Sequence, residues 1–190
     1  MAYSRPIDTH PALGRDLRAL RKTRGLTLGA LATRIGKSIG WLSEVERDLK
    51  TPAMDDLQAI AAALDVPVSI LFGAPASAAE AGHVVRAGAG RTLGDREAGL
   101  TETLLSPDLT DAFEVIHSRF APGTARTVPV SRPTQELATI TAGRLDVWLD
   151  DAGFTLGKGD SLRIRGQCYR WANPYDIPAE AIWVIAPPVY

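Results

Sequence analysis

Hydrophobic residues along this chain follow two different periods, and the change from one to the other divides the chain. From Leu13 to Phe72 they recur every three or four positions, which is typical of amphipathic helices. The first helix is expected to begin near Pro11, and Pro67 to open a short last one with Ile70, Leu71 and Phe72. The pattern predicts an all-α bundle of five helices that buries Leu13, Leu17 and Leu20; Leu31, Ala32 and Ile35; Leu42, Val45 and Leu49; and Leu57, Ile60, Ala61 and Leu64.

Two of these helices are short and lie close together between Leu26 and Asp48. Thr27 is a good N-cap for the first, Gly36 can take the left-handed conformation that ends it, and Ser38 can cap the second. Two helices joined by a tight turn that contains Gly form a helix-turn-helix unit. The residues of its second helix that lie away from the predicted buried stripe are free to enter a DNA major groove: Ile39, Gly40, Ser43, Glu44 and Arg47.

After His83 the pattern changes to period 2. Phe113, Val115 and His117 alternate with the residues between them, and residues 145–149 and 182–184 alternate in the same way. Gly-rich turns separate these runs at residues 121–123, 142–143, 151–153 and 157–160. Short alternating strands with regular turn signals predict an all-β sandwich or barrel.

A composition shift lies between the two patterns. Residues 73–82, GAPASAAEAG, are small and nearly uncharged, which indicates an interdomain linker or a short Ala-rich helix. Residues 1–10 are polar and are expected to be a mobile arm. We therefore predict a helical domain over residues 11–73, a linker with the first strand over 74–94, and a β domain over 95–190.

Composition excludes several classes of protein. The formal net charge is −1, with +2 over residues 1–73 and −3 over the remainder, so only the front part is slightly basic. The single cysteine, Cys168, cannot form an internal disulfide. No apolar run approaches the roughly 18 residues of a membrane helix, and the N-terminus has no apolar signal segment. We expect a cytoplasmic protein without a membrane partner.

The helix-turn-helix resembles the lambda repressor/Cro-like (XRE) family. The resemblance covers roughly residues 13–73. Two positions depart from the family pattern: Leu28 stands where a DNA-touching Gln is common, and Asp48 stands where Gly is common. The matching positions are Thr27, Leu31, Ala32, Gly36, Ser38, Leu42, Ser43, Val45, Glu46, Pro52, Leu57, Ile60, Ala61, Leu64, Val66 and Phe72.

The resemblance implies that the protein binds double-stranded operator DNA as a homodimer. It also implies an ion pair between Arg21 and Glu46 that braces the first helix against the recognition helix. Trp41 is expected to pack on the sugar-phosphate edge or on the preceding helix. The predicted DNA-binding residues are Thr27, Leu28, Ser38, Ile39, Gly40, Trp41, Ser43, Glu44, Arg47 and Lys50.

The rear domain resembles a cupin, a small jelly-roll barrel, over about residues 95–190. Gly123, Glu136 and Gly143 match the first cupin motif, and Gly166 and Asn173 match the second. The three metal-binding histidines of the family are replaced by Pro129, Ser131 and Tyr169. Pro, Ser and Tyr do not replace imidazole well as ligands of divalent transition metals. His117 could point inward, but one His and one Glu do not make a transition-metal site, so we predict no metal and no other cofactor.

A cupin without its metal ligands can still hold a small molecule. Tyr169, Trp171 and Asn173 share one strand face, and Glu136, Ala138 and Ile140 are expected to share the inward face of another. These six residues are the predicted effector pocket. Some of the arginines of this domain could form a fork for a carboxylate: Arg119, Arg126, Arg132, Arg163, Arg165 and Arg170.

These features predict a DNA-binding transcription regulator whose cupin domain binds a small-molecule effector and supports dimerisation. Two alternatives remain at the sequence level. One is a cupin enzyme with an accessory DNA-binding domain, which a stoichiometric transition metal would favour. The other is an antitoxin-like partner protein whose rear domain only dimerises, in which case no small molecule should raise its melting temperature.

Overall fold

The computed structural model describes residues 13–72, 79–94 and 97–189, and the chain divides into two compact units. The first unit holds the helices and extends to Arg91, with residues 107–110 added to it; the second holds Thr92–Ser106 and residues from Asp111 onward. The predicted N-terminal arm, the start of the first helix near Pro11, and residues 73–78 of the predicted linker lie outside the described residues.

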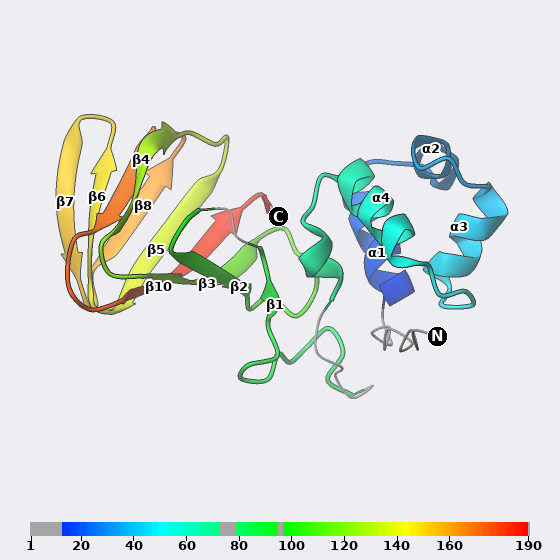
Figure 1. Ribbon diagram of the computed structural model, residues 1–190, viewed down its shortest axis with the longest axis horizontal. Coiled ribbons are helices and arrows are strands. Elements are labelled where there is room, and N and C mark those ends of the chain that lie inside the picture. The colour runs from blue at the N-terminus through cyan, green and yellow to red at the C-terminus, as the bar shows by residue number, and fades with distance from the viewer. Residues whose placement is uncertain (1–12, 73–78, 95–96, 190) are drawn as a thin grey trace, which may run out of the picture. The chain divides into compact units, whose positions relative to one another are not determined.

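Within the described residues the helical unit has four α-helices: α1 (Leu13–Thr23), α2 (Leu28–Arg34), α3 (Ile39–Glu46) and α4 (Met54–Leu64) (Figure 1). The prediction of a fifth α-helix was wrong, because Val68–Leu71 forms a short 3₁₀ helix, η1. Only four residues lie between Pro67, which caps η1, and Phe72, which is already extended, so there is no room for α-helical hydrogen bonding to continue. Its Ile70 and Leu71 are nevertheless fully buried.

The helix-turn-helix forms through local capping as predicted. Thr27 Oγ1 accepts from the N–H of Ala30 at 3.1 Å, and Ser38 Oγ accepts from the N–H of Trp41 at 3.1 Å. Gly36, with φ +65°, ends α2 in a Schellman motif. The motif leaves α2 and α3 joined by a tight turn, with α3 at the edge of the helical unit (Figure 1).

Asp48 ends α3 in the same way, and it explains one departure from the family pattern. It has a φ of +55° and occupies the left-handed position where Gly is common. Its Oδ1 accepts from the N–H of Gly14 at 2.7 Å, in the first turn of α1. Because α3 ends at Glu46, the prediction that Leu49 is buried was wrong; Leu49 is 64% exposed, whereas Leu42 and Val45 are buried.

The second unit contains nearly all of the β structure. A six-stranded sheet has the order β1-β2-β3-β10-β5-β8, and a four-stranded sheet has the order β4-β9-β6-β7 (Figure 1). The strands are β1 (Arg91–Thr92), β2 (Leu100–Leu104), β3 (Glu114–Phe120), β4 (Thr124–Val130), β5 (Gln135–Ala142), β6 (Arg144–Leu149), β7 (Ala152–Gly157), β8 (Ser161–Arg165), β9 (Tyr169–Asn173) and β10 (Ala179–Ala186).

The two sheets form a sandwich, one of the two architectures that the strand pattern predicted, and the jelly-roll barrel that the cupin resemblance implied is not closed. The connections β4–β5 and β7–β8 carry the chain from one sheet to the other without pairing the strands they join. Among the residues that the structure describes, both sheets therefore keep unpaired edges, at β1, β8, β4 and β7. Alternation along β5 and β9 buries Glu136, Ala138 and Ile140 from one sheet and Tyr169, Trp171 and Asn173 from the other, as the period-2 pattern predicted.

His117 on β3 does not point into the sandwich, as an inward metal ligand would. Glu114, Ile116, Ser118 and Phe120 form the buried face of β3, so His117 is on the other side of the sheet. There its Nε2 lies 3.2 Å from Oε2 of Glu180 on the neighbouring strand β10. None of the helices in the described residues has the length and apolar character that a membrane span requires.

Candidate DNA-binding face and ligand cavity

α3 is held by a buried ion pair with α1. Arg21 Nε donates to Glu46 Oε1 at 2.6 Å, and Nη2 donates to Oε2 at 2.8 Å. Nη1 donates to the carbonyl of Leu26 at 2.8 Å, so the guanidinium connects α1 with α3 and with the turn before α2. The hydrogen bond to Glu46 raises the pKa of Arg21, against desolvation by burial, and so favours the charged form of the guanidinium. The structure thus contains the brace that the family resemblance implied.

The outer face of α3 presents a mixed set of side chains to solvent. Ile39 is 58% exposed although it is a large aliphatic residue, and Gly40, Glu44 and Arg47 are exposed around it. Ser43 is half-buried on the same helix. Lys50 Nζ lies 3.5 Å from Glu44 Oε2, and both side chains are about half exposed. The face therefore combines an apolar group, hydrogen-bonding groups and cations, which is the chemistry that base edges and phosphates require.

The remaining residues of the predicted DNA-binding set lie around the two helix N-termini. Thr27 and Ser38 are exposed and use their oxygens as caps, while their hydroxyl protons remain available. Leu28 is half-buried in the first turn of α2. Trp41 is half-buried, with the ammonium of Lys37 5.0 Å from the ring centroid. Lys37 also pairs with Asp56 at 2.6 Å. The ring of Trp41 is therefore covered by a cation that already has a carboxylate partner.

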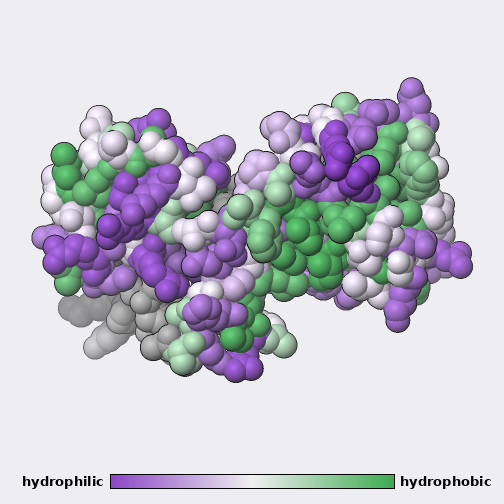
Figure 2. Space-filling model, turned by 180° about the vertical axis from the view of Figure 1, so that it is seen from behind, coloured by the Kyte–Doolittle hydropathy of each residue, from purple (hydrophilic) through white to green (hydrophobic). Residues whose placement is uncertain are grey.

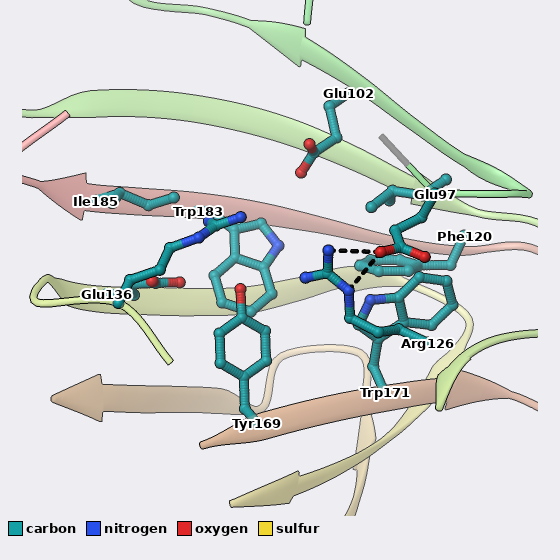
Figure 3. A pocket seen from close by; sticks show the side chains of 11 residues that line it. Glu97, Glu102, Phe120, Arg126, Glu136, Tyr169, Trp171, Trp183 and Ile185 are labelled. Atoms are coloured by element: carbon teal, nitrogen blue, oxygen red, sulfur yellow. Dashed lines mark hydrogen bonds and ion pairs between the residues drawn. The ribbon is translucent and has the colours of Figure 1, made fainter. Parts of the chain in front are cut away.

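A cavity opens between the two sheets of the second unit. It holds about 430 Å³, counting the part open to solvent. Figure 3 shows Tyr169 rising from β9 into its centre, with Glu136 on one side and Arg126 with Trp171 on the other. The lining residues are Glu97, Leu100, Glu102, Phe120, Arg126, Arg132, Glu136, Tyr169, Trp171, Trp183 and Ile185.

The cavity includes three of the six residues predicted for the effector pocket. Glu136, Tyr169 and Trp171 line it, whereas Ala138 and Ile140 are buried without lining it. Asn173 does not line this cavity, because its side chain binds the backbone of nearby residues instead. Its Nδ2 donates to the carbonyls of Phe120 and Ile177 at 3.0 and 2.9 Å, and its Oδ1 accepts from the N–H of Tyr175 at 3.2 Å.

Charged groups surround the aromatic centre of the cavity. Arg126 Nε donates to Glu97 Oε1 at 2.7 Å, and Nη2 lies 2.5 Å from the same oxygen (Figure 3). Burial and then the neighbouring carboxylate of Glu136 raise the pKa of Tyr169 to about 12, against the guanidiniums of Arg132 and Arg126. The phenol therefore stays protonated at neutral pH and can donate or accept a hydrogen bond.

Comparisons with known proteins agree with both halves of this description. A helix-turn-helix domain matches residues 12–69, and a cupin domain matches residues 116–185. The transcriptional regulator ClgR of Mycobacterium tuberculosis is 35% identical over 97 residues, which are 50% of this chain and 87% of ClgR. The chain belongs to the XRE-like helix-turn-helix transcriptional regulators that carry a cupin domain.

Similarity also extends over both domains together. The HTH-type transcriptional regulator SutR of Escherichia coli is 28% identical over 152 residues, 80% of each chain. A solved structure of an HTH_3 family transcriptional regulator from Vibrio cholerae is 23% identical and covers 93% of this chain and 95% of that one, with a TM-score of 0.45.

In this regulator the donor set of a cupin metal site is absent from the described part of the chain. No three His, Cys, Asp or Glu side chains gather there in a way that could hold a metal ion. Ser131, at one former histidine position, is exposed and donates its hydroxyl to the carbonyl of Gly166 at 2.9 Å. Pro129 is exposed, and Tyr169 offers a protonated phenol.

Sequence reasoning did not place most of the charged lining of the cavity. Arg126 and Arg132 were among six candidate arginines, and their neighbours Glu97 and Glu102 were not considered. These residues come from β2, β4 and the loops before β2 and β5. Alternation could have indicated the inward phase of Glu102, two residues after the buried Leu100, but no motif marks the loop residues.

Proposed function

We propose that this regulator binds operator DNA through α3 and that its cupin domain both senses a small molecule and joins two copies of the chain. The observation that carries the first part is the mixed, solvent-facing surface of α3 on a helix braced by Arg21 and Glu46. A rigid helix with exposed polar groups is what reading of the major groove requires. Because its target is chromosomal operator DNA, we propose that it acts in the cytoplasm.

Side chains on and beside α3 can contact specific groups on the bases and phosphates of DNA. Glu44 can accept from the amino group of cytosine, Ser43 can bond to several bases, and Ile39 can contact a thymine methyl. Arg47, Lys50 and Lys37 are suited to phosphate contacts, which position the protein without reading sequence. The ion pairs of Lys50 and Lys37 join partly exposed side chains, so they cost little to exchange for phosphate.

We expect Ser43→Ala and Glu44→Ala each to reduce discrimination at one operator base pair by about 1–3 kcal/mol, because each removes a hydrogen-bonding group. Titrations of matched and singly mismatched operators measure this difference. Asp55→Asn is the matched control, since it removes a carboxylate from an exposed position on α4 and changes the net charge equally. Equal discrimination by the parent and both variants would contradict a reading role for α3.

The proposed dimer has a candidate surface on the outside of the six-stranded sheet. Val184 on β10 is aligned with Val115 on β3 and Leu137 on β5, so three apolar side chains form a row across adjacent strands. Val184 is 38% exposed and Leu137 48%, and Figure 2 shows hydrophobic side chains gathered on this unit. An exposed apolar area of this kind favours association with another protein surface.

We expect the protein to be a homodimer at micromolar concentration and to protect two half-sites whose centres are about 34 Å, or a multiple of it, apart. Val184→Asp should shift the light-scattering mass from dimer to monomer, because a charge in an apolar interface is costly to desolvate. Val128→Asp is the control, since Val128 is 75% exposed on β4 of the other sheet. A monomeric parent that protects one half-site would contradict the proposal.

We further propose that the cupin domain is not an enzyme. The residues at the three former histidine positions, Pro129, Ser131 and Tyr169, are poor ligands for a divalent transition metal. Metal analysis of the purified protein tests this, and a stoichiometric transition metal would favour a cupin enzyme instead.

An effector acts if it has different affinities for DNA-competent and DNA-incompetent arrangements of the chain, so its addition should change operator affinity.

A further inference from the structure

The carboxylate of Glu136 is a buried polar group of the cavity that is only half satisfied. Only 2% of this residue is exposed. Its Oε1 accepts from Thr134 Oγ1 at 2.7 Å, but its Oε2 is buried without a hydrogen-bond partner. Burying a polar atom without a partner is unfavourable, and more so for a charged group. Since Glu136 lines the cavity, a ligand with an N–H donor can supply the missing hydrogen bond.

The charges around Glu136 favour a positively charged donor. The cavity lining holds three carboxylates, Glu97, Glu102 and Glu136, against the guanidiniums of Arg126 and Arg132. Arg126 is paired with Glu97, and Glu102 accepts only a neutral hydroxyl, from Ser118 Oγ at 3.0 Å. The carboxylates therefore outnumber the guanidiniums by one, and within the described residues Glu136 forms no ion pair with either arginine, which favours a cation beside it.

The walls between these charges are aromatic. Tyr169 and Trp183 stack with ring centroids 6.2 Å apart, and Phe120 meets Trp171 edge-on at 4.7 Å. The faces of such rings attract ammonium groups, and they also exclude water from hydrogen bonds made beside them. The hydroxyl of Tyr169 rises between Glu136 and Arg126, where it can orient a polar ligand (Figure 3).

Arg132 provides an anion-binding group for the same ligand. It lines the cavity, is half-buried, and within the described residues makes no hydrogen bond or ion pair. Its guanidinium can bind a carboxylate with two parallel N–H···O bonds. A ligand that satisfies both Glu136 and Arg132 carries a protonated amine and a carboxylate on one small skeleton.

We propose that the cavity binds a small amino-acid-like compound, with its ammonium group on Glu136 Oε2 and its carboxylate on Arg132. The inference rests on the proposed effector-sensing function and specifies its ligand class. A plain amine would leave Arg132 unused, and a plain acid would leave Glu136 without a donor and add a second negative charge beside it. Both should therefore bind more weakly than a compound that carries the two groups.

Isothermal titration of the full-length protein tests this with three matched series: standard L-amino acids, the amines that lack their carboxylate, and the acids that lack their amine. We expect at least one amino acid to bind, and its amine and acid counterparts to bind about tenfold or more weakly. Glu136→Gln and Arg132→Gln should each weaken that amino acid by a similar factor. Asp151→Asn, an exposed carboxylate between β6 and β7, should leave binding unchanged.

Several outcomes would overturn the inference. The first is that no amino acid of the series binds. The second is that an acid or an amine binds as tightly as its parent amino acid. The third is that the Glu136→Gln variant binds the amino acid with unchanged affinity. Glu136→Gln keeps the shape of the side chain, and its thermal unfolding shows whether lost binding reflects lost folding. Operator titration separates the two proposals: DNA binding without any amino acid binding refutes the ligand class alone, whereas amino acid binding without DNA binding refutes the proposed function alone.

Discussion

Glu46→Ala is expected to destabilise the helical unit by about 3–5 kcal/mol, because it leaves a buried guanidinium without its counter-ion. Arg21 and Glu46 have side chains only 10% and 5% exposed, and they are joined by two hydrogen bonds of 2.6 and 2.8 Å. Domains are commonly stable by only about 5–15 kcal/mol, so this loss is a large fraction of the total. Chemical denaturation monitored by far-ultraviolet circular dichroism, which reports helix content, measures it.

Two comparisons make the result specific to a buried charge. Replacing both partners, as Arg21→Met with Glu46→Leu, should cost much less than Glu46→Ala, because no charge is left unpaired. Lys50→Ala removes an ion pair with Glu44 whose side chains are about half exposed, and it should change stability by less than about 1 kcal/mol. If Glu46→Ala were as mild as Lys50→Ala, the pair would not be the brace of α3.

Gly143→Ala is expected to destabilise the β unit by about 3 kcal/mol, through two separate penalties. Gly143 joins β5 to β6 with a φ of +70°, a conformation that L side chains rarely adopt. A Cβ there would also lie 2.3 Å from the carbonyl oxygen of Pro178 and 2.8 Å from Cα of Ala179, so the backbone before β10 would have to move. Thermal unfolding followed by tryptophan fluorescence reports chiefly on this unit, because Trp148, Trp171 and Trp183 lie in it and Trp41 lies in the helical unit.

Gly159→Ala separates the two penalties. Gly159 also has a positive φ, +93°, but a Cβ there would meet nothing within 4 Å. Its substitution should cost only about 1–2 kcal/mol, from the backbone conformation alone. Equal effects of Gly143→Ala and Gly159→Ala would show that the approach of Pro178 contributes nothing to the requirement for glycine at residue 143.

Features that depend on neighbouring residues could be predicted from the sequence. The caps at Thr27 and Ser38, the left-handed Gly36 and the buried faces of α1 and α4 require only helical geometry within a few residues. The inward phase of Glu136 and Tyr169 follows from alternation within a single strand. The Arg21–Glu46 pair spans 25 residues and was predicted from family resemblance, not from local pattern.

Features that depend on where an element ends were less predictable. The apolar spacing continued through Leu49 and Phe72, yet α3 ends at Glu46 and residues 68–71 form a 3₁₀ turn. Apolar spacing does not show where backbone hydrogen bonding stops. Asp48 ends α3 in a left-handed conformation, and its carboxylate accepts from Gly14 on another helix, an interaction over 34 residues.

The sequence alone determined that a helix-turn-helix precedes a β domain that lacks the cupin histidines, because these properties belong to residue types and their local spacing. Only the tertiary structure decided that His117 faces Glu180 on the outer side of β3, that Asn173 binds the carbonyls of Phe120 and Ile177, and that Arg126 and Arg132 line the same cavity as Glu136. Such groupings depend on how strands distant in sequence pair and on which way each sheet faces. A period-2 pattern is the same in either phase until the sheet packs against its partner.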